Sequence, residues 1–391
     1  MKTLACVVGA RPNFVKMAPV LAGLREMAPD IRPVLVHTGQ HYDEAMSDRF
    51  FAQLGLPEPD VHLEVGSGPH GQQTARVLER YEAWLMSSMS SDARPDATLV
   101  VGDVNSTLAC ALASVKLGIP VIHVEAGLRS LDRAMPEEIN RVLTDAISDL
   151  LLVSEPSGVE NLRREGRPES AIRLVGNVMI DVLALQLPEA RALGQPEKLG
   201  LQRGEYAVWT LHRPSNVDEP EALRSAVERL QLTARRLPVV FPVHPRTERK
   251  LRESGLETRL SDDPRVILTE PLGYLEFLGL SSEARLIVTD SGGLQEESTA
   301  LGIPCLTLRS TTERPITIEE GTSTLVDGNW TLFDTLIGDI LEGRYKQGSC
   351  PRLWDGRAGR RVAREVAEFL ALTPGPPLPG VRACGRERGR G

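Results

Sequence analysis

The sequence predicts an α/β protein built from two doubly wound, Rossmann-like domains. Short apolar runs alternate with stretches of helical length along most of the chain. The 391 residues exceed one ordinary domain and suit two domains of about 150–200 residues each. The runs are apolar along their whole length, as expected of strands buried on both faces of a parallel sheet.

The first half supplies six expected strands. Leu4–Val8 comes first, and apolar residues at helical spacing follow it. The other five are expected at Val34–Val36, Ala97–Val101, Val121–Val124, Leu150–Val153 and Ile172–Val175. Because helix-length sequence separates them, we expect parallel strands with helices on both faces.

A linker is predicted near Gly176–Gly204, where Pro, Gly and charged residues interrupt the rhythm. Beyond it, strands are expected at Tyr206–Thr210, Val239–Val243, Val266–Leu268, Leu286–Thr289 and Cys305–Leu308. We therefore predict an N-terminal domain over residues 1–180 and a C-terminal domain over 181–355, facing each other across a cleft. Residues 356–372 are expected to form a helix that packs back on the first domain, and residues 373–391 a disordered tail.

Composition excludes several classes of function. A net charge of −8 argues against nucleic-acid binding. No window has the length of a membrane span, and the N-terminus resembles a first strand rather than a signal peptide. Cys6, Cys110 and Cys305 lie in apolar runs, which predicts buried free thiols in a cytoplasmic protein. No GxGxxG follows the first strand and no metal-ligand spacing occurs, so we expect neither a dinucleotide cofactor nor a metal.

The most informative segment is Leu286–Gly321, which has the pattern of a strand, a tight glycine turn, a helix and another strand. The turn Ser291-Gly292-Gly293 would present backbone N–H groups at a positive helix end, where phosphate binds. Acids follow within one helical turn, among them Glu297, and carboxylates suit the hydroxyls of a sugar. A nucleotide or nucleotide sugar is therefore the first ligand to consider.

Two buried strands end in carboxylates. Asp103 follows Ala97–Val101, and Glu125 lies at the end of Val121–Val124. Acids at such positions are costly unless they are paired or used, and strand ends of one parallel sheet meet at one edge. The pair favours a functional site.

A helix is predicted from Pro136, with Ile139, Val142, Leu143, Ala146 and Ile147 on one apolar stripe. Glu137 and Arg141 share the opposite face, and their spacing favours a surface ion pair.

Cations and histidines follow other strands. Arg11 and Lys16 flank the first helix start, and His212 and Arg314 follow strands of the second half. Cations there can neutralise a diphosphate. A lone histidine is more often structural than functional, and the His244-Arg246 pair is interpreted in the same way.

Ten segments in unbroken order resemble the non-hydrolysing UDP-N-acetylglucosamine 2-epimerases. They are GARPNFVKMAPV, TGQHYDEAM, VVGDVNSTLA, HVEAGLRS, MPEEINR, LVGNVMID, TLHRP, PVHPR, TDSGGLQEES and TTERP. The resemblance spans residues 2–370 and implies the two-domain architecture of many nucleotide-sugar glycosyltransferases, a UDP-sugar substrate and a homodimer. No cofactor is implied.

The resemblance also implies roles for individual residues. The catalytic set is Asp103, Glu125, Glu137 and His212. The implied substrate contacts are Arg11, Lys16, Arg141, Leu272, Phe277, Ser291, Gly292, Gly293, Glu297 and Arg314, with Leu272 standing where other members have Gln. In the family's route a base removes the C2 proton while UDP leaves C1, and a glycal-like intermediate forms. Proton and UDP then return, with the proton on the opposite face.

Some segments depart from the family pattern. Gln40-His41 matches part of an allosteric site, but Asp43 and Gly66-Ser67-Gly68-Pro69 differ from its other parts. Arg213-Pro214-Ser215-Asn216 also differs from the Arg-Arg-Glu of some members. We expect this difference to affect which substrate is accepted.

The sequence leaves four alternative activities open. They are an epimerase of a 2,3-diacetamido or 6-deoxy UDP-sugar, a hydrolysing epimerase, a retaining glycosyltransferase and a non-catalytic sensor. Val104-Asn105 lacks the arginine associated with the hydrolysing group.

Overall fold

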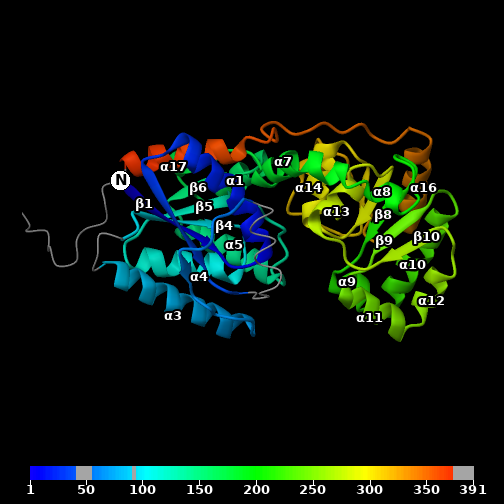
Figure 1. Ribbon diagram of the computed structural model, residues 1–391, viewed down its shortest axis with the longest axis horizontal. Coiled ribbons are helices and arrows are strands. Elements are labelled where there is room, and N and C mark those ends of the chain that lie inside the picture. Colours follow the sequence, from blue (N-terminus) through cyan, green and yellow to red (C-terminus); the bar gives the residue numbers. More distant parts are fainter. Residues whose placement is uncertain (41–54, 90–93, 373–391) are drawn as a thin grey trace, which may run out of the picture.

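The computed structural model describes residues 1–40, 55–89 and 94–372. It forms two lobes side by side, each with a parallel sheet between helices (Figure 1). The first sheet has the order β3-β2-β1-β4-β5-β6-β7 and the second the order β10-β9-β8-β11-β12-β13. Both are doubly wound, so the predicted fold class is confirmed.

The predicted runs coincide with strands, some of them a few residues longer than predicted and others one residue shorter. In the first sheet they are β1 (Lys2–Val8), β2 (Ile31–His37), β3 (Val61–His62), β4 (Ala97–Val101), β5 (Val121–Ala126), β6 (Leu150–Val153) and β7 (Ile172–Leu174). In the second they are β8 (Ala207–Thr210), β9 (Val239–Pro242), β10 (Val266–Thr269), β11 (Leu286–Thr289), β12 (Cys305–Thr307) and β13 (Ser323–Leu325). The sequence missed β3 and β13, which are short edge strands.

Helices cover both faces of each sheet. The first lobe has α1 (Arg11–Met27), α3 (His70–Met89), α4 (Asn105–Lys116), α5 (Pro136–Ile147), α6 (Pro156–Arg164) and the 3₁₀ turn Glu169–Ala171. The second has α8 (Gln195–Lys198), α9 (Pro214–Val217), α10 (Pro220–Ala234), α11 (Pro245–Glu253), α12 (Leu256–Ser261), α13 (Tyr274–Ser281), α14 (Gly292–Leu301), α15 (Ile316–Glu319) and α16 (Trp330–Leu341). Several begin with proline, whose missing N–H has no intrahelical partner in the first turn.

Alternate residues of β1 enter different cores, because successive side chains of a strand point to opposite faces. Leu4, Cys6 and Val8 pack with α1, whereas Val7 packs with α3 and α4. The predicted burial of Cys6, Cys110 and Cys305 as free thiols is confirmed.

The first part of the predicted linker is a packed helix rather than an irregular segment. Residues Val178–Ala192 form the helix α7, which continues through Pro188 and buries Ile180, Val182 and Leu183. In Figure 1 this helix runs from one lobe to the other, and it contacts both α1 and α13. A domain boundary at residue 180 stays a prediction, because α7 packs against both halves.

The chain returns to the first lobe at its end. Helix α17 (Ala358–Leu372) packs along α1 (Figure 1). A side chain at Gly23 would meet the carbonyl of Gly359, and one at Gly359 would meet the carbonyl of Pro19, so neither position has room for a side chain. The predicted tail, residues 373–391, lies outside the described residues. Within the described part of the chain, no helix is both long and apolar enough to cross a membrane.

Candidate active site

Glu125 lies at the carboxyl end of β5 in an unusual backbone conformation. Its φ of 71° is in the left-handed region, and the register with β6 shifts between Val124 and Ala126. Such a bulge re-aims a side chain at a cost of about 1–3 kcal/mol for the strained residue. The bulge therefore directs one carboxylate away from the regular alternation of the strand.

That carboxylate is buried between two cations from different lobes. Lys16 of α1 contacts Oε2 of Glu125, and Nη2 of Arg314 is 3.1 Å from Oε1. Burial alone would raise the pKa of Glu125, but the charges of Lys16 and Arg314 outweigh it and hold the pKa below its usual value. Glu125 is consequently an ionised base at neutral pH.

Arg314 also contacts two acids of its own lobe. Its Nη1 is 2.7 Å from Glu313, and its Nε contacts Glu296. Burial would lower the pKa of Arg314, yet the surrounding carboxylates raise it well above its usual value. Glu296 in turn accepts a 2.9 Å hydrogen bond from Asn177, which immediately precedes α7. The guanidinium thus ties the strand ends of the two sheets together.

Asp103, after β4, is paired with Arg141 of α5. The Nε of Arg141 is 3.1 Å from Asp103, and its Nη1 is 2.9 Å from Glu138. Arg141 also lowers the pKa of Glu125, after the larger effects of burial, Lys16 and Arg314. One buried arginine therefore lies between both predicted strand-end acids.

The expected orientation of α5 is wrong. Arg141 is not in a surface pair with Glu137; it is buried, as are Glu138 and Asp145, while Ile139 and Leu143 are 40% and 47% exposed. The polar stripe faces inward because its partners lie there. Arg141 is 3.1 Å from Asp103, and Asp145 is 2.7 Å from His123.

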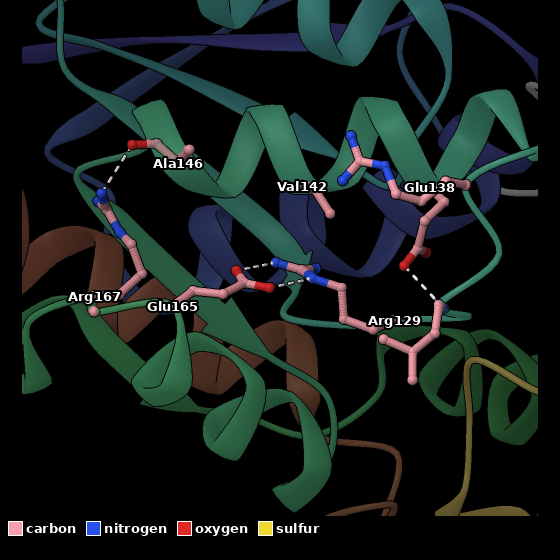
Figure 2. A pocket seen from close by; sticks show the side chains of 9 residues that line it. Arg129, Glu138, Val142, Ala146, Glu165 and Arg167 are labelled. Carbon is pink, nitrogen blue, oxygen red and sulfur yellow. Dashed lines mark hydrogen bonds and ion pairs between the residues drawn. The ribbon is translucent and has the colours of Figure 1, made fainter.

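A cavity of about 580 Å³ lies between α5 and residues 165–167, which follow α6 (Figure 2). Its walls include Val142, Ala146, Glu138 and three arginines. Arg129 binds Glu165 and Arg167 binds the carbonyl of Ala146. None of the predicted site residues lines this cavity.

The turn after β11 has the expected form. Ser291 precedes α14, and its N–H donates to Thr289 Oγ1 at 2.9 Å. A side chain at Gly292 would meet Glu313 at 2.7 Å, whereas one at Gly293 would enter open space. At the start of α14, the space beside Gly292 is therefore filled by Glu313, whereas the space beside Gly293 is open.

His212 follows β8, the strand next to β11 in the sheet. Its Nδ1 is 2.7 Å from Asp290, and its ring lies 5.9 Å from that of His244. Burial, together with the charges of His212 and Arg246, lowers the pKa of His244. Both histidines therefore lie at the point where the strand order reverses, where open α/β sheets bind ligands.

The remaining predicted residues lie on or beside helices α1, α5, α13 and α14. Glu297 on α14 is buried and accepts a 3.5 Å hydrogen bond from Tyr274, and burial raises its pKa to about 7. Leu272, just before α13, and Phe277, within it, are partly buried. Arg11 is exposed at the start of α1, and Glu137 is close enough to Arg213 to affect that residue's pKa.

Sequence reasoning assigns no individual role to four buried acids of this region, Glu138, Glu155, Asp290 and Glu296. Three of them lie inside segments that carry the family resemblance, and Glu155 lies two residues after the predicted strand Leu150–Val153. Their burial next to cations was the missing information, since polarity alone suggests exposure. In the described ranges, no group of three or more His, Cys, Asp or Glu side chains could hold a metal ion.

The family model for UDP-N-acetylglucosamine 2-epimerase matches residues 13–367. The chain belongs to this family. Its assignment as an epimerase, and hence an isomerase, is confirmed at that level. This family member is 43% identical to a UDP-N-acetylglucosamine 2-epimerase of Methanococcus maripaludis, over 94% of its own length and 98% of the relative.

Two further comparisons bear on the epimerase. It is 41% identical to the UDP-2,3-diacetamido-2,3-dideoxy-D-glucuronate 2-epimerase of Pseudomonas aeruginosa, over 94% and 100% of the two chains. A crystal structure of Methanocaldococcus jannaschii UDP-GlcNAc 2-epimerase in complex with UDP-GlcNAc and UDP superposes with a TM-score of 0.81. The identity is 40%, covering 94% of this chain and 99% of that one.

Proposed function

We propose that this family member interconverts UDP-GlcNAc and UDP-ManNAc without hydrolysis. The observation that carries the proposal is the ionised Glu125, held at a bulge between Lys16 of the first lobe and Arg314 of the second. A base flanked by cations suits a reaction in which proton removal and departure of a diphosphate are linked. The named activities of the similar proteins support the same reaction.

The reaction balances as an elimination followed by an addition. A carboxylate removes the proton from C2, the C–H electron pair forms a C1=C2 double bond, and the C1–O bond breaks to release UDP. The intermediate is 2-acetamidoglucal. UDP oxygen then adds back to C1 while an acid delivers a proton to the other face of C2.

We assign proton transfer to Asp103 together with Glu125 or Glu137. Arg11, Lys16 and His212 would stabilise the leaving diphosphate with the N–H groups of the turn at residues 291–293. Because Lys16 and Arg314 contact Glu125, a diphosphate that draws either cation away makes the carboxylate a stronger base.

The rest of the proposed site recognises the nucleotide and the sugar. Glu297 would accept the ribose hydroxyls, Leu272 and Phe277 would contact the uracil, and Arg141 would hold Asp103 in place. The expected homodimer remains a prediction.

A second substrate is favoured by one comparison. The relative that acts on a diacetamido-glucuronate sugar is nearly as similar as the relative named for UDP-GlcNAc, at 41% against 43% identity. Its substrate carries a carboxylate at C6 and a second acetamido group. The same C2 chemistry would apply to either sugar.

Exchange in D₂O tests both proposals. The protein is incubated with UDP-GlcNAc, or with the diacetamido-glucuronate sugar, and C2 is followed by NMR. Deuterium at C2 of intact UDP-sugar supports the epimerase, and the faster substrate identifies the sugar. Free sugar would mean hydrolysis, and no exchange with either sugar would refute the proposal. Glu125→Gln should abolish exchange, whereas Glu169→Gln, at a surface pair with Arg163, should not.

A further inference from the structure

Asp290 is a fully buried carboxylate whose described side-chain contacts go to one short segment, residues 212–216, which runs from the loop after β8 into α9. It lies between β11 and the glycine turn, and its side chain has no exposed surface. This segment donates to it from the backbone N–H groups of His212 and Arg213 and from the side chain of Asn216 in α9. The His212 ring completes the set through Nδ1.

The two oxygens of Asp290 have different neighbours. Oδ2 lies 2.9 Å from the N–H of Arg213, 3.1 Å from that of His212 and 3.1 Å from Asn216. Oδ1 lies 2.7 Å from Nδ1 of His212 and 3.2 Å from its backbone nitrogen. All of these groups donate, so the carboxylate is a pure acceptor and Nδ1 must carry its proton.

We propose that Asp290 is the positioning residue for His212: it holds the imidazole by Nδ1–H and leaves Nε2 to contact an anion at the glycine turn. Asp290 and the turn are adjacent in sequence, so one carboxylate links the ring to the proposed diphosphate site. An Nε2 that contacts an anion must itself donate, so in the complex the ring carries both protons, with Nδ1–H on Asp290 and Nε2–H on the diphosphate as a charge-assisted hydrogen bond. The anion's identity rests on the proposed function, whereas the state of the ring does not.

Asp290→Asn separates positioning from simple packing. The amide oxygen must take the place of Oδ2, which faces three donors, so the amide NH₂ takes the place of Oδ1. It then donates to Nδ1 and forces the ring proton onto Nε2. A variant of nearly the same shape should thus change the tautomer of His212.

The first measurement is ¹⁵N NMR of histidine-labelled protein without ligand, with His212 assigned from a His212→Asn variant. We expect protonated Nδ1 in the wild type and protonated Nε2 in Asp290→Asn. Asp218→Asn is the matched control, because Asp218 comes directly after α9 but pairs with Arg246 at the surface instead of contacting His212. It should leave the ring unchanged.

The second measurement is titration with UDP and C2 exchange. Loss of one charge-assisted hydrogen bond should weaken UDP binding, and lower kcat/KM, by about tenfold to a hundredfold. Asp290→Asn combined with His212→Asn should be no worse than His212→Asn alone, because the two residues act as a unit.

The proposal is overturned if His212 keeps its Nδ1 proton in Asp290→Asn. It is also overturned if the losses of kcat/KM caused by Asp290→Asn and His212→Asn multiply in the double variant. Should Asp290→Asn not fold, an unprotonated Nδ1 in the wild type would overturn it equally. If wild-type protein binds UDP without exchanging C2 in any sugar, the proposed function fails. The Asp290 proposal is then judged by the ring state and UDP affinity alone.

Discussion

Arg314→Met should destabilise the protein strongly, because the side chain neutralises buried acids of both lobes. Two of those acids keep another cation: Glu125 retains Lys16, and Glu313 retains Arg309 at 2.8 Å. Glu296 keeps only the hydrogen bond from Asn177. In the described part of the chain the buried Glu296 then has no ion pair, and removing one partner of a buried pair costs about 3–5 kcal/mol.

Urea unfolding at pH 7 measures this loss. The matched control is Arg246→Met, which removes an arginine of a surface pair whose side chains are 38% and 36% exposed. That change should cost at most about 1 kcal/mol. Adding Glu296→Gln to Arg314→Met should recover about 1–3 kcal/mol, since it removes the uncompensated charge.

Two results would refute the reasoning. One is an Arg314→Met variant no less stable than Arg246→Met, which would mean that the buried cluster relaxes or admits water. The other is a double variant with no recovery, which would place the cost somewhere other than Glu296.

Three further predictions concern the turn, a buried acid and the outer helix. Gly292→Ala should lower the melting temperature, because its Cβ would lie 2.7 Å from Glu313, whereas Gly293→Ala should melt normally but bind UDP more weakly in a titration. Burial raises the pKa of Glu155 from 4.5 to about 7, so wild-type stability should fall as pH rises through that range. Glu155→Gln should remove its share of the fall, while that of Glu297 remains, and should exceed the wild type by about 3 kcal/mol above pH 7 in urea unfolding; equal pH slopes would contradict this. Leu143→Glu, on the exposed apolar stripe of α5, should lower the sedimentation coefficient if the predicted homodimer uses that stripe, and an unchanged value would exclude this face.

Local pattern determined much of the fold. Apolar runs such as Leu286–Thr289 are buried strands because parallel sheets covered on both faces need continuous hydrophobic sequence. The turn Ser291-Gly292-Gly293 was also predicted from sequence, because two adjacent glycines after an apolar run indicate a tight turn. The structure gives the reason for the first of them, which is the close approach of Glu313 to Gly292. The resemblance to the epimerase family also followed from sequence order alone.

Only the tertiary structure decided how the charged residues are used. Glu125 and Arg314 are 189 residues apart, and no periodicity connects them. The stripe on α5 was visible in the sequence, but its direction was not. Burying Arg141 becomes favourable only once Asp103 is placed opposite it by another strand. Local sequence reports which face of an element is apolar, whereas the stability of a buried charge depends on partners that the folded chain brings together.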